Sequence, residues 1–409
     1  MTRIAILSDI HFGKFARCET FAVPGEAIQD NSAGDLPLED GLVDLMQEMN
    51  PQYIFLAGDL TSIGEPQEFW YCERKIVSIA DQVGINHGNI ICCLGNHDIN
   101  WNISGIANQK IKEGTVEEVA KVIKAKYENM AATSAINCLD EFEAPSGEKK
   151  GPAPYTGIYE SDNFIVFVLN TGVLCIKEQA YPHGKLSIEQ LDWFKKESEA
   201  KKNISKVKIV LMHHHPINYA YPVPTQDISV LEEGPEFVDI AIKNGINIVI
   251  HGHRHHPRVE TVQRNSGGPI TFICAGSLAV NTMHRKNGEI PNTVHFLDIE
   301  RERDFYVLHN FKYTGLEGWK PMICSRVTPL AQVMNVGKII PEKEINKSID
   351  AYKDSPRAFI KIEWEQIDDC LKFMTYDSLN NKLRERLNDV YNINGRFPES
   401  VMLTKKGEA

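Results

Sequence analysis

Seven short apolar segments, each ending in residues that can bind a metal or turn the chain, constrain the fold of this sequence more than any other feature. They are RIAILSD (3–9), YIFLAGD (53–59), NIICCLGNHD (89–98), FIVFVLNTG (164–172), KIVLMHHH (208–215), NIVIHGH (247–253) and ITFICAGS (270–277). Apolar runs of about four to eight residues without polar alternation are typical of strands that other elements cover on both faces. The sequence therefore predicts a sheet with both faces buried.

Stretches with helical spacing of apolar residues lie between these segments. Residues 38–50 (LEDGLVDLMQEMN) place leucines and methionines on one side of a helix. Residues 187–200 (SIEQLDWFKKESEA) form a second such pattern, with Ile188 among the residues expected to be buried. This second stretch begins with Ser187 and Gln190 at the spacing of a capping box. The alternation of strands and helices predicts a layered α/β domain.

Polar side chains of the metal-ligand type follow five of the apolar segments. They are Asp9 with His11, Asp59, Asn96 with His97 and Asp98, His213 to His215, and His253 with His255. In α/β folds the loops that leave the carboxyl ends of strands converge on one crevice. We therefore expect these side chains to form one site rather than five separate polar turns.

The composition of this set suits two divalent cations. Carboxylate, amide and imidazole groups together favour Mn, Fe or Zn, whereas the thiolates of a structural zinc site are absent from the set. The groups are too many for one tetrahedral ion. In two-metal sites a carboxylate commonly bridges the ions, and a water held between them becomes a nucleophile near neutral pH. This chemistry suits the hydrolysis of a phosphate ester.

Five motifs in this order resemble those of the calcineurin-like metallophosphoesterase superfamily. They are DIH (9–11), GD (58–59), GNHD (95–98), HHHP (213–216) and GHRH (252–255). The segments HGKLSIEQLDWF (183–194) and VLMHHHP (210–216) resemble more narrowly the class III cyclic-nucleotide phosphodiesterase branch and its purple-acid-phosphatase-like relatives. The resemblance implies a four-layer α/β/β/α sandwich, extended here by a C-terminal α+β part.

The resemblance also implies which residues bind the metals. It assigns the ligands of a first ion to Asp9, His11 and His255. It assigns those of a second ion to Asn96, His213 and His253, with Asp59 bridging the two.

Two assignments in the catalytic part of the site rest on the same resemblance. His97 is expected to touch the scissile phosphate and assist the leaving oxygen, with Asp98 holding its ring. Two adjacent histidines are candidates for the same ligand of the second ion. Alignment on the preceding apolar strand favours His213, whereas counting back from Pro216 favours His214.

The 409 residues divide into an expected metallophosphoesterase domain at 1–311 and a C-terminal extension at 312–409. Two long connections, 13–37 and 99–155, are expected to be insertions that cap the site around a small substrate. The extension contains an expected strand in AFIKIEW and an expected helix that runs from Leu379 to Ile393. Its role is open between regulation, homo-oligomerisation, substrate gating and completion of the fold.

Charge and targeting signals limit which partners and which cellular compartment are expected. The 44 Lys and Arg against 55 Asp and Glu give a net charge of −11, which disfavours general nucleic-acid binding. The N-terminus enters an apolar strand at once, without the regions of a secretory signal, and no apolar run is long enough for a membrane helix. Nine cysteines without a C-x-x-C pair fit a reducing compartment. We therefore expect a cytoplasmic protein without a membrane partner.

The expected function is hydrolysis of a small phosphodiester, with cyclic nucleotides among the candidates. A phosphomonoesterase and a nuclease of the same superfamily are the enzymatic alternatives. A protein Ser/Thr phosphatase would be expected to show GDxVDRG and GNHE, where this chain has GDLTSIG and GNHD. A metal-bound scaffold or sensor is the non-enzymatic alternative, and the retention of His97 and Asp59 argues against it.

Overall fold

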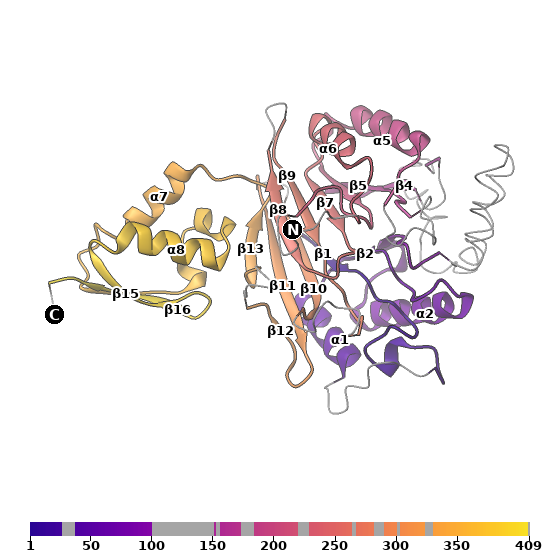
Figure 1. The fold of residues 1–409 in the computed structure, drawn as a ribbon, viewed down its shortest axis with the longest axis horizontal. Helices are drawn as coiled ribbons and strands as arrows, with labels where there is room; N and C mark the ends of the chain where they lie inside the picture. Colours follow the sequence, from indigo (N-terminus) through magenta and orange to yellow (C-terminus); the bar gives the residue numbers. More distant parts are fainter. Residues whose placement is uncertain are drawn as a thin grey trace.

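Two β-sheets lie face to face at the centre of the molecule (Figure 1). The computed structural model describes residues 1–26, 37–99, 151–152, 156–172, 184–219, 229–263, 267–281, 290–300, 303–323 and 330–407. Residues 27–36 of the first expected insertion and most of the second therefore lie outside the described residues, and so does the expected helix within the second one. Among the described helices, none has the length and apolar content that crossing a bilayer requires.

The first sheet has the order β12-β11-β10-β1-β2-β3, with β13 paired to β11. Its strands are β1 (Thr2–Leu7), β2 (Tyr53–Ala57), β3 (Ile90–Cys93), β10 (Asn292–Ile299), β11 (Tyr306–Thr314), β12 (Gly318–Pro321) and β13 (Val333–Val336). The pairs β1–β2 and β2–β3 are parallel, so the carboxyl ends of these three strands meet at one edge. The remaining pairs are antiparallel.

The second sheet has the order β4-β5-β6-β7-β9-β8. Its strands are β4 (Gly157–Glu160), β5 (Phe164–Val168), β6 (Val207–Leu211), β7 (Ile248–His251), β8 (Arg258–Val262) and β9 (Ile270–Cys274). The four central strands are parallel, whereas β4 and β8 are antiparallel edge strands. This parallel core brings the ends of β6 and β7 to one edge of the sheet.

Helices cover the outer face of each sheet, as Figure 1 shows. Residues of α1 (Leu38–Met49) and α2 (Pro66–Val83) pack against the first sheet. Residues of α5 (Ile188–Ala200) and α6 (Gly234–Lys243) pack against the second. The predicted α/β/β/α sandwich is thereby confirmed.

The apolar strands are buried on both sides, as their sequences predict. In β1, Ile4 and Ile6 belong to the core between the two sheets, while Ala5 and Leu7 belong to the core under the helices. Successive side chains of a strand point to opposite faces, so both sets must be apolar. This explains why no polar alternation is seen in these segments.

One detail of the predicted helix at 187–200 is wrong. Ser187 does cap α5, since its Oγ accepts a hydrogen bond from Gln190 N at 3.2 Å. Ile188, however, is 77% exposed rather than buried. Gln190 is the residue that turns inward, where its amide bonds the backbone N and O of Asn170, both at 3.2 Å.

The C-terminal part forms a third, three-stranded sheet with the order β14-β16-β15. Its elements are α7 (Glu342–Asp350), β14 (Phe359–Ile362), η3 (Trp364–Gln366), η4 (Asp369–Phe373), α8 (Tyr376–Leu387), β15 (Tyr391–Arg396) and β16 (Ser400–Lys405). The expected strand is present, but the expected helix ends at Leu387, and Tyr391 begins a strand instead. Strands β11 to β13 pair within the first sheet, so we propose that the domain boundary falls after Val336 rather than near residue 311.

Buried aromatic residues attach this part to the first sheet. Trp364 is 3% exposed, donates from Nε1 to Val333 O at 3.1 Å, and meets the Tyr376 ring edge-on at 4.5 Å. Asn335 of β13 donates to Asp369 O at 3.0 Å. The third sheet is therefore anchored to β13 through packing as well as hydrogen bonds.

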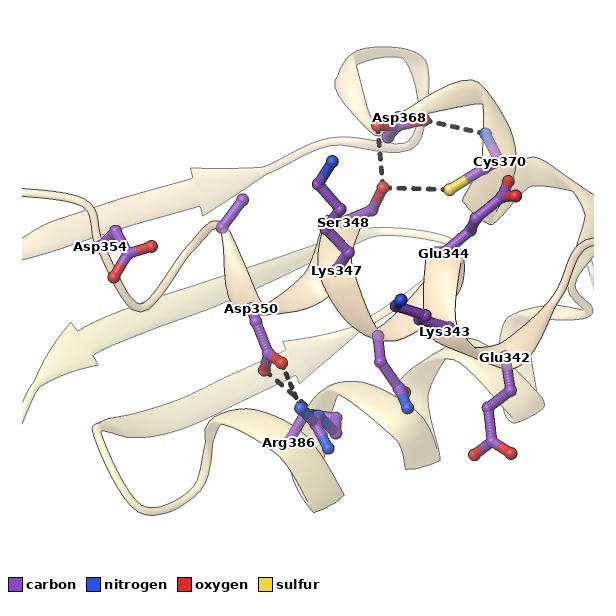
Figure 2. A pocket seen from close by; sticks show the side chains of 12 residues that line it. Glu342, Lys343, Glu344, Lys347, Ser348, Asp350, Asp354, Asp368, Cys370 and Arg386 are labelled. Atoms are coloured by element: carbon purple, nitrogen blue, oxygen red, sulfur yellow. Dashed lines mark hydrogen bonds and ion pairs between the residues drawn. The ribbon is translucent and has the colours of Figure 1, made fainter.

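An open groove of about 1260 Å³ runs along α7. Figure 2 shows Asp350 directed toward Arg386 of α8, and Ser348 between Asp368 and Cys370. Ser348 Oγ donates to Asp368 Oδ2 at 2.9 Å and accepts from Cys370 Sγ at 3.1 Å. None of the residues lining this groove belongs to the predicted ligand set.

Candidate dimetal site

The predicted ligands lie in turns that directly follow parallel strands. Five of them adopt a left-handed backbone, with φ of 49° at Asp9, 51° at His11, 51° at Asp59, 71° at His253 and 51° at His255. This conformation costs a non-glycine residue roughly 1–2 kcal/mol. Such residues cluster at functional sites, where the surrounding structure holds them in place. The shared conformation therefore marks these turns as one functional unit.

The first ligand group contains Asp9, His11, Asp59 and His255, whose ligand atoms all lie within 4.8 Å of one another. His255 Nε2 is 3.1 Å from Asp9 Oδ1 and 3.1 Å from His11 Nε2. His11 Nε2 is 3.6 Å from Asp59 Oδ2. Two ring nitrogens and two carboxylates thus converge on one point, as expected for a cation site.

The second ligand group contains Asp59, His213 and His253. His213 Nε2 is 3.1 Å from Asp59 Oδ2, and the rings of His213 and His253 are 5.1 Å apart. Asp59 belongs to both groups. A carboxylate in that position can bridge two cations.

The geometry gathers His213 rather than His214 into the second group. The Nδ1 atom of His213 donates to Ala57 O at 2.8 Å, which leaves Nε2 directed at Asp59. His214 instead places its Nδ1 2.7 Å from Thr171 Oγ1. Its ring lies 4.3 Å from that of His253, so it packs beside the ligands.

Asn96, His97 and Asp98 lie in the turn after β3. Asn96 is 2% exposed. The backbone N of His97 donates a hydrogen bond to Asp59 Oδ1 at 2.8 Å. This bond holds the turn against the shared carboxylate. The GNHD motif is therefore next to both ligand groups.

The His97 ring has a backbone partner that the sequence did not indicate. Its Nδ1 bonds Ser62 O at 2.7 Å. The Asp98 carboxylate accepts from Thr61 N at 2.9 Å, Thr61 Oγ1 at 3.0 Å and Gly95 N at 2.9 Å. Asp98 thus ties the turn after β2 to the turn after β3 through two backbone amides and one hydroxyl, and its contact with the His97 ring stays a prediction.

Burial sets the protonation of several ligands. It lowers the pKa of His11 well below the ordinary value, with His97 lowering it further. It also lowers the pKa of His253. Burial opposes protonation of His213 too, but the Asp59 carboxylate outweighs it and raises the pKa of His213 to about 9. A cation bound between His213 and Asp59 would therefore displace a proton.

Two glycines let the backbone approach these ligands closely. Gly58 has φ of 85°, and a Cβ there would lie 2.5 Å from His213 Nδ1. A Cβ on Gly252 would lie 2.4 Å from Asp9 Oδ2 and 2.0 Å from Ser8 Oγ. Both motif glycines are thus required by the space that the ligands occupy.

The donor set fits a pair of divalent cations. Ser8 Oγ donates to Asp9 Oδ2 at 2.5 Å, which orients that carboxylate toward the first group. His213 is oriented by Ala57 O, as metal-binding histidines commonly are by a carbonyl at the other ring nitrogen. Mixed oxygen and nitrogen donors of this kind suit Mn, Fe or Zn.

Sequence reasoning missed several residues that bond the turns around these candidate ligands. Thr61 and Ser62 bind the GNHD turn, and Tyr219 bonds His251 Nε2 through its hydroxyl at 2.5 Å. Thr61 and Ser62 stand within three residues of Asp59, and that proximity was the only available signal. Tyr219 lies in no motif, so nothing in the sequence pointed to it.

The family model of the calcineurin-like phosphoesterases matches residues 2–257. This range covers more than half of the chain and includes all five motifs. The chain belongs to this family. Membership implies a hydrolase of phosphoric esters, and together with the two ligand groups it indicates a dimetal site.

Comparison with solved structures finds distant similarities. A dimetal phosphatase from Danio rerio is 10% identical, with 78% of this chain and 98% of that one covered and a TM-score of 0.45. Purple acid phosphatase PPD1 from yellow lupin (Lupinus luteus) seeds is 11% identical, with 82% of this chain covered and a TM-score of 0.49. The chain spans 54% of that plant protein. No curated protein matches the sequence.

Proposed function

We propose that this protein is a binuclear metal-dependent phosphodiesterase that hydrolyses a small phosphodiester, with cyclic nucleotides as the first natural candidates. The observation that carries the proposal is the membership of Asp59 in both ligand groups. A carboxylate shared in this way is suited to two cations about 3.5–4 Å apart. Such pairs are used for in-line displacement at phosphorus.

In this proposal each cation has its own ligands beside the shared carboxylate. The first is held by Asp9, His11 and His255, and the second by Asn96, His213 and His253. When bound, two divalent cations neutralise charge on the phosphoryl oxygens and acidify a water between them. The protein supplies the turns that hold these ligands at fixed positions.

His97 is the residue proposed to deliver a proton to the leaving oxygen. Its ring lies 4.6 Å from the ring of His11, at the edge of the first ligand group, and it is half-buried. Because Nδ1 is hydrogen-bonded to Ser62 O, Nε2 is the atom proposed to act on a substrate. A positioned imidazole of this kind contributes typically about 10²–10⁴-fold to rate.

The preference for a diester rests on the narrower sequence resemblance. Residues 188–194 of the segment 183–194 form the start of α5, and residues 210 and 211 of the segment 210–216 end β6 just before His213. They resemble the class III cyclic-nucleotide phosphodiesterases. A phosphomonoester is the competing substrate class, and one assay separates the two.

The assay compares bis-p-nitrophenyl phosphate with p-nitrophenyl phosphate, with Mn(II) supplied. Asp59→Asn serves as the blank because it keeps the shape of the side chain and removes the bridging charge. Asp192→Asn, on the exposed side of α5, is the matched control. Diester hydrolysis that is lost in Asp59→Asn and kept in Asp192→Asn supports the proposal.

The same series contains the outcomes that overturn it. Cleavage of the monoester alone replaces the diesterase proposal with a phosphatase. If neither ester is hydrolysed although metals are bound, a binding role is favoured. After diester cleavage, the 2′,3′- and 3′,5′-cyclic nucleotides identify the natural substrate class.

A further inference from the structure

Ser62 is fully buried and fixes the segment that carries His11. Its Oγ donates to His11 O at 2.7 Å and accepts from Phe15 N at 3.1 Å. Its backbone N donates to Phe12 O at 3.0 Å. Three bonds from one residue thus hold the turn after β1 against the turn after β2.

The same residue also holds the ring of His97. The carbonyl of Ser62 bonds His97 Nδ1 at 2.7 Å. A carbonyl can only accept, so Nδ1 is the donor of this bond, and Nε2 is the nitrogen from which a proton would pass to the leaving oxygen. The ring is further bounded by Phe15, edge-on at 5.9 Å, and by His11 at 4.6 Å.

We propose that Ser62 is a positioning residue that couples the metal ligand His11 to the proton donor His97. Its hydroxyl fixes the backbone of His11, and its carbonyl fixes the ring of His97, so the two move as one unit. The inference rests on the proposed role of His97 in ester hydrolysis. It adds a connection between metal binding and proton transfer that no sequence motif carries.

Removal of the hydroxyl should disturb this coupling while the carbonyl itself remains. In Ser62→Ala, His11 O and Phe15 N each lose this hydrogen bond, and the turn is free to shift. Residues that orient metal ligands typically contribute about 10–100-fold to activity. We therefore expect kcat to fall by about that factor for esters whose leaving group needs a proton.

The test uses leaving groups that differ in this need. Bis-p-nitrophenyl phosphate releases a stable anion, whereas diphenyl phosphate releases a more basic one that depends on the proton donor. Ser62→Ala should lower kcat for diphenyl phosphate about 10–100-fold and for the nitrophenyl ester several-fold less. Ser62→Thr, which keeps a hydroxyl, should restore the wild-type ratio of the two.

Ser198→Ala is the matched control. Ser198 is also fully buried, and its Oγ donates to Phe194 O at 2.6 Å and accepts from Asn244 Nδ2 at 2.8 Å. The variant loses the same kinds of bond on α5, away from the ligands. It should leave the ratio of the two substrates unchanged, and thermal unfolding of both variants shows whether the fold is kept.

A second measurement does not depend on activity or on the variants. Long-range ¹H–¹⁵N spectra of histidine-labelled wild-type protein loaded with Zn(II) report the tautomer of His97. A hydrogen on Nδ1 is expected, whether or not Nε2 is also protonated, and an Nδ1 without a hydrogen would overturn the proposal.

Equal loss of kcat for both leaving groups in Ser62→Ala would also overturn the proposal, because it indicates a general structural defect. The monoesters phenyl phosphate and p-nitrophenyl phosphate are measured in the same series. If wild-type protein cleaves only these, the proposed diester substrate is wrong, while their ratio still decides the role of Ser62.

Discussion

Glu68 is expected to make folding stability depend on pH between about 4.5 and 7. The side chain is 2% exposed at the start of α2. Its Oε2 accepts from Ile63 N at 2.9 Å and Glu65 N at 3.2 Å, whereas Oε1 is buried without a hydrogen bond among the described residues. Burial raises the pKa of Glu68 from 4.5 to about 7.

The sign follows from proton binding in the two states. Between pH 4.5 and about 7 the folded chain keeps the proton of Glu68 and the unfolded chain has released it. Stability contributed by this group is therefore complete below the unfolded value and is lost as pH rises through the folded one. At 1.36 kcal/mol for each pH unit between the two pKa values, the loss amounts to about 3 kcal/mol.

The assay is urea unfolding of wild type and Glu68→Gln across this range. Glutamine resembles the protonated acid, so the variant should gain about 3 kcal/mol relative to wild type between pH 4.5 and neutral pH. Glu48→Gln, at an exposed position of α1, controls for removal of one negative charge. A difference between Glu68→Gln and wild type that does not change with pH would refute the reasoning.

Three further substitutions test other parts of the account. His97→Ala should lower kcat about 10²–10⁴-fold and leave metal content unchanged; metal loss on elemental analysis would contradict its assignment as a proton donor. In Gly252→Ala the new Cβ would lie 2.4 Å from Asp9 Oδ2. This variant should bind Mn(II) more weakly in calorimetry and lose about 1–3 kcal/mol of stability. Gly268→Ala is the control, because a Cβ at Gly268 meets open space, and it should change neither quantity. Trp364→Ala should destabilise the C-terminal part by about 3–5 kcal/mol, and an unchanged thermal transition would show that its packing is dispensable.

The sheets could be predicted because burial on both faces leaves a plain sequence signature. Ile4 and Ile6 face the second sheet, whereas Ala5 and Leu7 face the helices, so every position of β1 had to be apolar. The gathering of the candidate ligands could be predicted because each follows such a strand. The left-handed turns that gather them leave a weaker signature, since aspartate and histidine also occur in ordinary turns.

The details that escaped prediction depend on contacts with other parts of the chain. Apolar spacing placed Ile188 in the core, but Gln190 turned inward because its amide bonds both backbone atoms of Asn170. The helical pattern before Tyr391 continues past the end of α8, yet Tyr391 is held in β15 by its pairing with Lys405. The partner of His97 is a backbone carbonyl, which any residue type could supply.

The central claim is that Asp59 holds two metal ions together. The most direct measurement is the Mn(II) content of reconstituted wild type, Asp59→Asn and Asp192→Asn after gel filtration. We expect two ions per chain in wild type and in Asp192→Asn, and no more than one in Asp59→Asn. A single ion in wild type, or two ions retained in Asp59→Asn, would contradict the claim.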